Sequence, residues 1–261
     1  MSANEPVLLR QDEDGIARLT LNRPAQRNAL SVELMTALQQ AIDAIARDPK
    51  VKVVVIAANG PGFCGGHDLR EMRANPGRQH YEALFAQCSR LMVSLTKLAK
   101  PVIARVHGIA AAAGCQLVAS SDLAVASSEA RFAVNGINIG LFCSTPMVAL
   151  TRAVGRKPAM EMLLTGNLVD AEHARSIGLV NRVVAPERLD EEVTALARQI
   201  AGKLKLAVAI GKEAFYRQAE LGLEAAYAYT SEVMTRNMLA RDTEEGIDAF
   251  LEKRPPRWEN E

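Results

Sequence analysis

Two strand–loop–helix junctions in this sequence carry residue types that can position backbone N–H groups at a reaction centre. In the first, a β-branched run from Val102 to Val106 leads through His107-Gly108 into small residues, Ala110 to Gly114, and then into helical spacing from Cys115 to Ser121. Small side chains let a ligand approach the backbone, and the first turn of a helix has N–H groups without an intrahelical partner. An N–H that points at a carbonyl able to become an oxyanion is half of an oxyanion hole. On this stretch alone, close packing of the strand on the helix is the favoured interpretation.

The second junction repeats the order of strand, glycine-rich loop and helix start between Val53 and Leu69. Its glycines permit sharp turns and close approach of a ligand; they are Gly60, Gly62, Gly65 and Gly66. No Gly-Lys-Ser/Thr follows them, which excludes a phosphate-binding P-loop, and the G-x-G-x-x-G spacing of a dinucleotide-binding turn is absent. Because two such junctions occur in one chain, we favour a pair of converging N–H donors over packing alone.

The hydrophobic pattern predicts a layered α/β core that positions these junctions. Predicted strands cover residues 7–10, 16–22, 51–58, 102–106, 123–126, 131–134 and 179–184, with a hairpin turn at 12–15 and a loop at 59–66. Predicted helices begin after Ser31, at 68–73, along 81–98 and from Ser144 onward, with Asp170 as a cap and Gly178 as a stop. Three or four further helices are expected between 186 and 251, followed by a basic tail at 253–257.

Composition excludes several functional classes. The chain has 261 residues, 49% hydrophobic and 23% charged, and its net charge of +1 gives no reason to expect nucleic acid or an anionic membrane as a partner. No apolar run is long enough to cross a bilayer, so we expect no membrane insertion. The four cysteines have no metal-binding spacing, so no metal site is expected; they are Cys64, Cys88, Cys115 and Cys143. With no targeting peptide recognised, we expect a cytoplasmic protein of bacterial type.

The pattern changes near Ala201-Gly202, which divides the chain into a core, residues 1–200, and a helical region, residues 201–261. The predicted helix from Leu223 to Leu239 carries apolar residues without a core of its own. A subunit interface is the natural destination of such a face, so we expect the helical region to mediate oligomerisation.

Five segments resemble the crotonase, or enoyl-CoA hydratase/isomerase, superfamily. They are LNRPAQRNALS (21–31), GFCGGHDLREM (62–72), PVIARVHGIAAAAGCQL (101–117), LTRAVGRKPAMEMLLTG (150–166) and AFLEKRPP (249–256). AAAAGCQLVAS and GLFCST are similar in particular to its enoyl-CoA hydratase domain-containing protein 3 group. The resemblance covers nearly the whole chain. It implies a ClpP-like spiral of ββα units with a C-terminal helical trimerisation region, an acyl-CoA thioester substrate in fatty acid or other lipid metabolism, and a homotrimer or hexamer.

The resemblance also assigns roles to positions. The oxyanion donors would be the backbone N–H groups of His67 and Ala113, where the family usually has glycine at the latter position. Substrate-binding positions would be Arg27, Ala29, Cys64, Gly65, Gly66, Asp68, Leu69, Gly114, Asn135 and Phe142. Phe250 and Lys253 would reach the nucleotide end from a neighbouring subunit, unless Lys253 is simply a solvated tail charge. No cofactor is implied beyond coenzyme A as part of the substrate.

The two catalytic glutamates of the hydratases fall on Gln116 and Gly136. Glutamine cannot transfer a proton near neutral pH, and glycine offers only space, in which an anion or water could bind. Three hypotheses follow: a hydratase with another base, a malonyl- or methylmalonyl-CoA decarboxylase-like lyase, or an acyl-CoA binding protein without catalysis. The local candidates for another base or nucleophile are weak; they are His67, Cys143 and Ser144, while Asn135 and Asn138 can only form hydrogen bonds.

Overall fold

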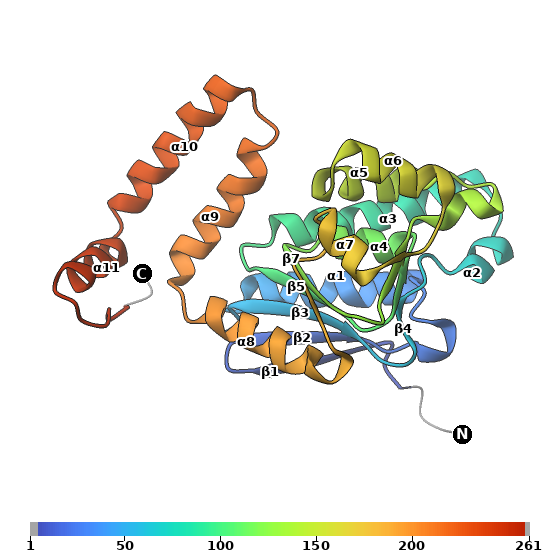
Figure 1. Ribbon diagram of the computed structural model, residues 1–261, viewed down its shortest axis with the longest axis horizontal. Coiled ribbons are helices and arrows are strands. Elements are labelled where there is room, and N and C mark those ends of the chain that lie inside the picture. The colour runs from blue at the N-terminus through green and yellow to red at the C-terminus, as the bar shows by residue number, and fades with distance from the viewer. Residues whose placement is uncertain (1–4, 259–261) are drawn as a thin grey trace.

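The computed structural model describes residues 5–258, so the outermost residues of the two predicted regions, 1–4 and 259–261, lie outside it. Its larger sheet has six strands in the order β1-β2-β3-β5-β7-β10 (Figure 1). These strands are β1 (Leu8–Glu13), β2 (Ile16–Leu21), β3 (Val53–Ala58), β5 (Val102–Val106), β7 (Leu123–Ser127) and β10 (Arg182–Val184). β1 and β2 are an antiparallel hairpin, and every later pair is parallel.

A second, smaller sheet has the order β4-β6-β8-β9. Its strands are β4 (Gly62–Cys64), β6 (Ile109–Ala111), β8 (Arg131–Ala133) and β9 (Val169–Asp170). The prediction of a continuous loop at 59–66 is therefore wrong, and so is a helix that starts only at Cys115, because α4 begins at Ala113. Strands of two or three residues are too short to show alternation in the sequence, and pairing with neighbouring strands decides them.

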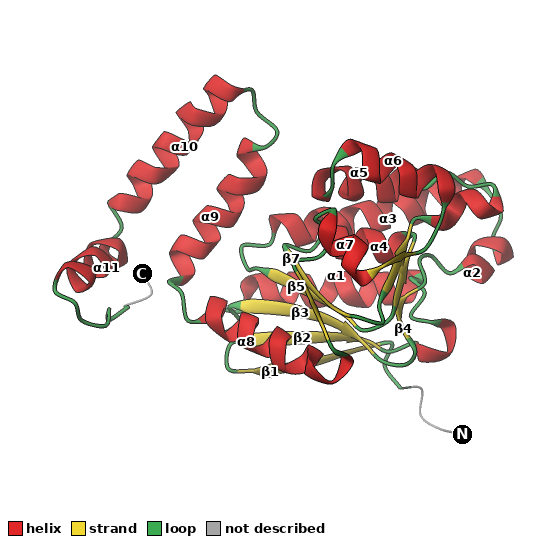
Figure 2. Cartoon of the chain, viewed as in Figure 1, coloured by secondary structure: helices red, strands yellow, loops and turns green. Residues whose placement is uncertain are grey.

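Helices cover both faces of the larger sheet (Figure 2). On β3, Val54 and Ile56 join the core under α1 (Val32–Arg47) and α3 (Arg78–Lys97), whereas Val53 and Val55 join the core under α8 (Leu189–Ala201). Successive side chains of a strand point to opposite faces, so the continuous β-branched run is buried on both sides. The α/β core predicted from the sequence is confirmed.

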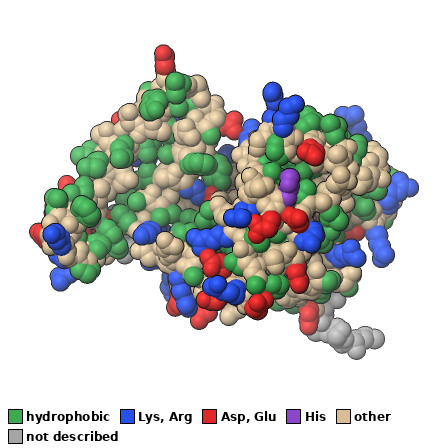
Figure 3. All heavy atoms as spheres, in the orientation of Figure 1, with side chains coloured by type: hydrophobic (Ala, Val, Ile, Leu, Met, Phe, Trp, Pro, Cys, Tyr) green, Lys and Arg blue, Asp and Glu red, His purple; other side chains and the backbone are tan. Residues whose placement is uncertain are grey.

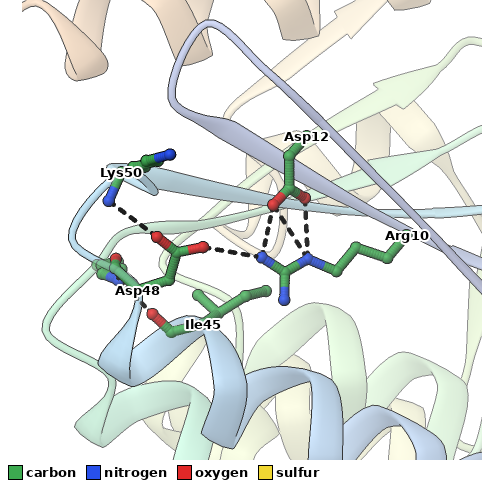
Figure 4. A network of polar contacts seen from close by, with 6 residues as sticks. Arg10, Asp12, Ile45, Asp48 and Lys50 are labelled. Carbon is green, nitrogen blue, oxygen red and sulfur yellow. Dashed lines mark hydrogen bonds and ion pairs between the residues drawn. The ribbon is translucent and has the colours of Figure 1, made fainter.

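The ends of α1 are fixed by polar side chains. Ser31 accepts a hydrogen bond from the N–H of Leu34 at 3.2 Å, as predicted for a cap. At the other end, Asp48 accepts from the N–H of Lys50 at 2.9 Å and pairs with Arg10 of β1 at 3.3 Å (Figure 4). The turn after α1 is thereby joined to the edge of the sheet.

The remaining elements of the core connect these layers. They are η1 (Pro24–Gln26), α2 (Leu69–Ala74), α4 (Ala113–Ala119), η2 (Asn135–Ile139), α5 (Ser144–Ala153), α6 (Arg156–Thr165), α7 (Ala171–Ser176) and η3 (Pro186–Arg188). Asp170 caps α7 by accepting from the N–H of His173 at 2.7 Å, as predicted. The last strand is shorter than predicted, because Leu179 and Val180 pack into the core as part of a turn before β10.

The C-terminal helices form an arm that extends away from the core (Figure 1). The arm consists of α9 (Lys205–Gln218), α10 (Leu223–Met238) and α11 (Arg241–Leu251), with α10 packed along α9. Hydrophobic side chains gather on its surface (Figure 3); the most exposed are Phe215, Leu223, Tyr227, Met234, Leu239, Phe250 and Leu251. Exposed apolar side chains gathered on one part of a protein often mark an interaction surface.

Candidate active site

The two junctions found in the sequence lie side by side. β4 pairs in parallel with β6, with Cys64 opposite Ala110, so the chain leaves both strands at the same edge of the small sheet. A β carbon built on Gly66 would lie 2.9 Å from the β carbon of Ala112 and 3.4 Å from the nitrogen of Ala113. The loop after β4 therefore touches the start of α4, and no side chain fits between them.

Gly114 makes a second close approach between the same two segments. A β carbon at this position would lie 2.1 Å from the carbonyl oxygen of Cys64, well inside van der Waals contact. The first turn of α4 can pack against β4 at this distance only because residue 114 is glycine.

Two backbone N–H groups at this meeting point are free. Within residues 5–258, neither His67 N nor Ala113 N donates a hydrogen bond, although the N–H groups of Asp68 and Ala112 do so, to Leu30 and Ala133. Ala113 is the first residue of α4, so its N–H has no partner within the helix. The N–H groups that the resemblance assigns as oxyanion donors, those of His67 and Ala113, thus have no acceptor among the described residues.

The unusual backbone conformation lies at Ala112 and not at Ala113, the position where the family usually has glycine. Ala113 is helical, whereas Ala112 has φ 48° and ψ −117°, a region that residues with a β carbon rarely adopt. Such a conformation costs about 1–3 kcal/mol and persists where surrounding contacts impose it. The hydrogen bond from Ala112 N to Ala133 O, 2.9 Å long, is one of these contacts.

The imidazole of His67 is turned into the protein. Its ring packs edge-on against Phe85 of α3, with 5.6 Å between the ring centres. Both ring nitrogens are buried without a hydrogen-bond partner of good geometry. Burial lowers the pKa of His67 below its ordinary value, and the nearby Leu30 backbone only partly opposes this shift. The ring is therefore neutral and shielded from water, which argues against His67 as the replacement base.

Gln116 is the third residue after Ala113 in α4, and it is only 4% exposed. Its Oε1 accepts a hydrogen bond from the Cys88 thiol of α3, with 3.9 Å between sulfur and oxygen. The side chain can orient a bound group but cannot take up or release a proton near neutral pH.

The expectation of open space above Gly136 is wrong. A β carbon built on this residue of η2 would lie 2.6 Å from the carbonyl oxygen of Leu141 and 2.9 Å from Cys143 Sγ. The Gly136 N–H donates to the same sulfur over 3.3 Å, so the turn closes on itself. Neither an anion nor a water has room in this direction.

Cys143 and Ser144 have no base beside them. Burial raises the pKa of the Cys143 thiol, which keeps it protonated. The Ser144 hydroxyl donates to the carbonyl of Phe142 at 3.3 Å. Within residues 5–258, no histidine or carboxylate bonds to either group, so the geometry offers no activated nucleophile.

The segment before α1 is held against the second junction by a buried amide. Asn28 has no exposed surface, and its Nδ2 donates to the carbonyls of Asn59 at 2.8 Å and Gly62 at 2.9 Å. The carbonyl of Arg27 in turn accepts from the N–H of Gly65 at 2.9 Å. This hydrogen bond brings Arg27 and Ala29 beside the end of β4 and the residues that follow it. Sequence reasoning missed the structural role of Asn28. Its φ is 53°, a conformation that asparagine adopts more readily than most residues, so the residue type was the available signal.

An ion pair that the sequence did not indicate joins the same segment to α2. Arg23 Nη2 lies 3.0 Å from Asp68 Oδ2, and both side chains are largely buried. Burial alone would raise the pKa of Asp68, but the Arg23 hydrogen bond and the N–H groups of Glu71 and Arg70 outweigh it, so the pKa is lowered. Asp68 also caps α2, whose first residue is the half-exposed Leu69.

The remaining sites are more dispersed. Asn135 precedes Gly136 at the start of η2, and Phe142 lies between η2 and α5, where it is exposed. Phe250 is 82% exposed near the end of α11, and Lys253 follows it; both lie on the arm, far from α4 (Figure 1). The chain itself therefore does not bring these two residues to the junctions.

Residues 5–258 contain no cluster of histidine, cysteine, aspartate or glutamate suited to a metal ion. No helix in the same range is both long and apolar enough to span a membrane.

Known proteins resemble the whole chain. A family described as enoyl-CoA hydratase/isomerase matches residues 11–261. Enoyl-CoA hydratase domain-containing protein 3, mitochondrial, of Xenopus laevis is 48% identical over 253 residues, 97% of this chain and 86% of that protein. The crystal structure of an enoyl-CoA hydratase from Mycobacterium smegmatis superposes with a TM-score of 0.96 at 57% identity, over 97% of this chain and 99% of that one.

The crystal structure of human enoyl-CoA hydratase domain-containing protein 3 gives a TM-score of 0.94 at 46% identity, covering 97% of this chain and 100% of that one. These similarities confirm the crotonase fold and the resemblance to this group. They leave the expected cytoplasmic location as a prediction, because the matching Xenopus protein is named as mitochondrial. The chain belongs to the enoyl-CoA hydratase/isomerase family.

Proposed function

We propose that this protein is an enzyme of acyl-CoA thioesters that holds the thioester carbonyl between the N–H groups of His67 and Ala113 and stabilises its enolate. The observation that supports this most directly is the pair of free N–H groups at two touching loops. A donor aimed at a developing oxyanion contributes about 2.7–4 kcal/mol to transition-state stabilisation. Both donors are backbone groups held by packed elements, so they need little reorganisation when charge develops.

The proposed chemistry is enolate stabilisation rather than efficient addition of water. Gln116 has no ionisable group, Gly136 has no side chain, and the ring of His67 is neutral and covered. A positioned acid or base typically contributes a factor of about 10²–10⁴, so hydration of an enoyl thioester should be slow here. Hydratase is the name of similar proteins, and for this chain it remains a prediction.

A decarboxylase-like reaction is the second candidate, and the closed turn at Gly136 favours it over hydration. Loss of carbon dioxide from a malonyl-type thioester produces the enolate directly, so oxyanion stabilisation supplies most of the catalysis. The absence of a side chain at position 136 and of a carboxylate at position 116 leaves no negative charge there to repel the leaving carboxylate. Binding of acyl-CoA without turnover is the outcome that would exclude both.

The coenzyme A part of the substrate would lie along the loops joined by Asn28. Arg27 and Ala29 would follow the pantetheine chain, and the backbone of Cys64, Gly65 and Gly66 would receive the adenine. The hydrogen bond between Arg27 O and Gly65 N places these loops together. No separate cofactor is required for this chemistry, and the substrate class suggests fatty acid or other lipid metabolism.

We also propose that the arm, formed by α9, α10 and α11, mediates assembly into a trimer or hexamer, as expected of the helical region from residue 201 onward. Its apolar residues have no core of their own, and burying each such side chain yields about 1.5–3 kcal/mol. In the assembly, Phe250 and Lys253 of one subunit would reach the nucleotide end of a neighbour's substrate.

The deciding experiment is mass spectrometry of CoA thioesters after incubation with the purified protein, with bound CoA measured in parallel. Crotonyl-, longer enoyl-, malonyl- and methylmalonyl-CoA are the substrates. Loss of carbon dioxide supports the decarboxylase-like reaction, gain of water restores the hydratase, and binding without a mass change leaves an acyl-CoA binding protein.

Ala113→Pro removes one donor and should abolish any turnover. The control is Arg156→Pro, which places proline at the exposed first residue of helix α6, where proline is tolerated. Unchanged turnover in a folded Ala113→Pro protein would show that the oxyanion site is wrongly placed.

A further inference from the structure

The amide of Gln116 is oriented by a residue of another helix. Cys88, in α3, has no exposed surface, and its thiol donates to Gln116 Oε1 over 3.9 Å. Burial raises the pKa of this thiol to about 12, so it is protonated and able to donate. An amide carries its acceptor and its donors on different atoms, and a donor bonded to Oε1 therefore determines which way Nε2 faces.

The nitrogen of the same amide has no protein partner. Within residues 5–258, Gln116 Nε2 donates to no other residue, yet it is not one of the fully buried polar atoms without a partner. Nε2 therefore keeps accessible surface, although Gln116 as a whole is only 4% exposed. The amide presents a donor, and not an acceptor, to the accessible space beside it.

Gln116 and Ala113 lie on the same side of α4. Residues three apart share a face of a helix, with about 5–6 Å between their β carbons, and helical side chains lean toward the N-terminal end. Gln116 is the third residue after Ala113, so the two share a face of α4 and the Gln116 side chain leans toward the N-terminal end, where Ala113 N donates to no described residue. A ligand whose carbonyl oxygen meets Ala113 N can place a second oxygen near Nε2.

We propose that Gln116 determines specificity by donating from Nε2 to an oxygen atom on the acyl group, and that Cys88 is the positioning residue that keeps the amide turned this way. The proposal rests on the proposed binding of acyl-CoA thioesters. The preferred ligands are thioesters whose acyl chain carries an acceptor, either a carboxylate, as in malonyl-CoA, or a ketone, as in acetoacetyl-CoA. An ionised glutamate at position 116 would offer no donor and would repel an acyl carboxylate.

The test measures dissociation constants by calorimetry for malonyl-CoA, acetoacetyl-CoA, butyryl-CoA and free CoA, with ligand integrity checked afterwards by mass spectrometry. We expect at least one of the two oxygen-bearing thioesters to bind about tenfold more tightly than butyryl-CoA, which corresponds to about 1.4 kcal/mol. The tighter of the two identifies the acceptor as carboxylate or ketone. Equal affinities for the three thioesters, all above that of free CoA, would overturn the role of Gln116 alone. Thioesters that bind no better than free CoA would overturn the proposed function itself.

Variants separate orientation from packing. Gln116→Met keeps the volume without the donors, so the ratio of the butyryl-CoA constant to that of the preferred ligand should fall toward one. Cys88→Ala should lower this ratio about threefold, because the Gln116 amide becomes free to turn. Cys88→Ser retains a hydrogen-bond donor and should preserve the wild-type ratio.

The matched control is Cys115→Ala. Cys115 is equally buried, and its thiol makes no hydrogen bond within residues 5–258. The substitution removes the same sulfur volume without touching the Gln116 amide, so the ratio should stay at the wild-type value. If Cys115→Ala lowers the ratio as much as Cys88→Ala, or if Cys88→Ser does not preserve it, the effect is one of packing and the positioning role of Cys88 is overturned.

Discussion

The carbonyl oxygen of Leu141 occupies the place where a side chain of residue 136 would begin. A β carbon on Gly136 would lie 2.6 Å from this oxygen, closer than non-bonded atoms approach one another. The Leu141 N–H donates to the Gly136 carbonyl at 2.9 Å, so the contact is part of a hydrogen-bonded turn and not a loose loop. The position of the second hydratase glutamate is therefore closed by the backbone as well as empty of an acid.

Gly136→Ala should lower the free energy of unfolding by about 1–3 kcal/mol, as over-packing does in a well-packed site. Urea denaturation of the purified protein measures it. The control is Gly211→Ala in α9, where nothing lies within 4 Å of the new β carbon and alanine should stabilise by about 0.5–1 kcal/mol.

The same closure predicts that glutamates cannot simply be restored. Gln116→Glu combined with Gly136→Glu should give an unstable protein without efficient hydratase activity. A stable double variant that hydrates crotonyl-CoA rapidly would show that the turn from 136 to 143 opens easily.

Ala112→Gly should stabilise the protein by about 1 kcal/mol, because glycine adopts φ 48° and ψ −117° without the steric cost that alanine bears. Thermal and urea unfolding provide the measurement. Ala110→Gly is the control. Ala110 lies in β6 and has no positive φ, so glycine at this position should lower the stability of the protein. A lower stability for Ala112→Gly would mean that the lost β carbon matters more than the strain.

Asp190 makes the fold sensitive to acid. Hydrogen bonds from Arg105, and also from Arg18, lower its pKa to about 2, although burial opposes the shift. Because the pKa is depressed in the folded state, the stabilisation is complete above the ordinary value near 3.8 and is lost as the pH falls toward 2.

The side chain of Asp190 is 56% exposed, so solvent screening limits this contribution to less than about 1 kcal/mol. Asp190→Asn should be less stable than the wild type at pH 6, with the difference shrinking between pH 4 and pH 2. Stability curves that stay parallel across this range would contradict the assignment.

A buried ion pair fixes the arm to the core. Lys212 of α9 donates to Asp122 Oδ2 at 2.6 Å and to the carbonyls of Leu95 and Lys100 at 2.9 and 3.0 Å. Tyr216 donates to the other oxygen of Asp122 at 2.9 Å. Asp122 Oδ2 also accepts from the N–H of Val102, at the start of β5.

Lys212→Met should cost about 3–5 kcal/mol, because it leaves the carboxylate of Asp122 buried without its cation. Limited proteolysis near residues 202–204 should become faster as the arm loosens. The control is Lys205→Met in the same helix, α9. It removes one long, exposed hydrogen bond of 3.4 Å to the carbonyl of Pro49 and should change neither the stability nor the rate of proteolysis. Equal effects of the two substitutions would show that general charge loss is responsible.

Most of the longer strands and helices could be predicted from the sequence, because the helical periodicity of 32–47 and the continuous β-branched run at 53–58 each fit one kind of element. The short strands β4, β6 and β9 could not. The two junctions were also identified from the sequence, because the order of strand, small residues and helix start occurs twice in one chain, at 53–69 and 102–121. The substitutions at positions 116 and 136 were likewise visible without coordinates, as residue types alone decide whether a proton can be transferred.

The surroundings of the junction residues and of positions 116 and 136 became known only from the tertiary structure. The short strands β4 and β6 form because they pair with each other. The unusual backbone conformation lies at Ala112, whose N–H donates to the carbonyl of Ala133 in β8. Two contacts join helix α3 to residues far from it in the chain: Phe85 packs against the ring of His67, and the Cys88 thiol donates to Gln116. A third, the Leu141 carbonyl beside Gly136, depends on an irregular turn. Such contacts depend on distances of a few tenths of an ångström between packed atoms, and no local periodicity in a sequence encodes them.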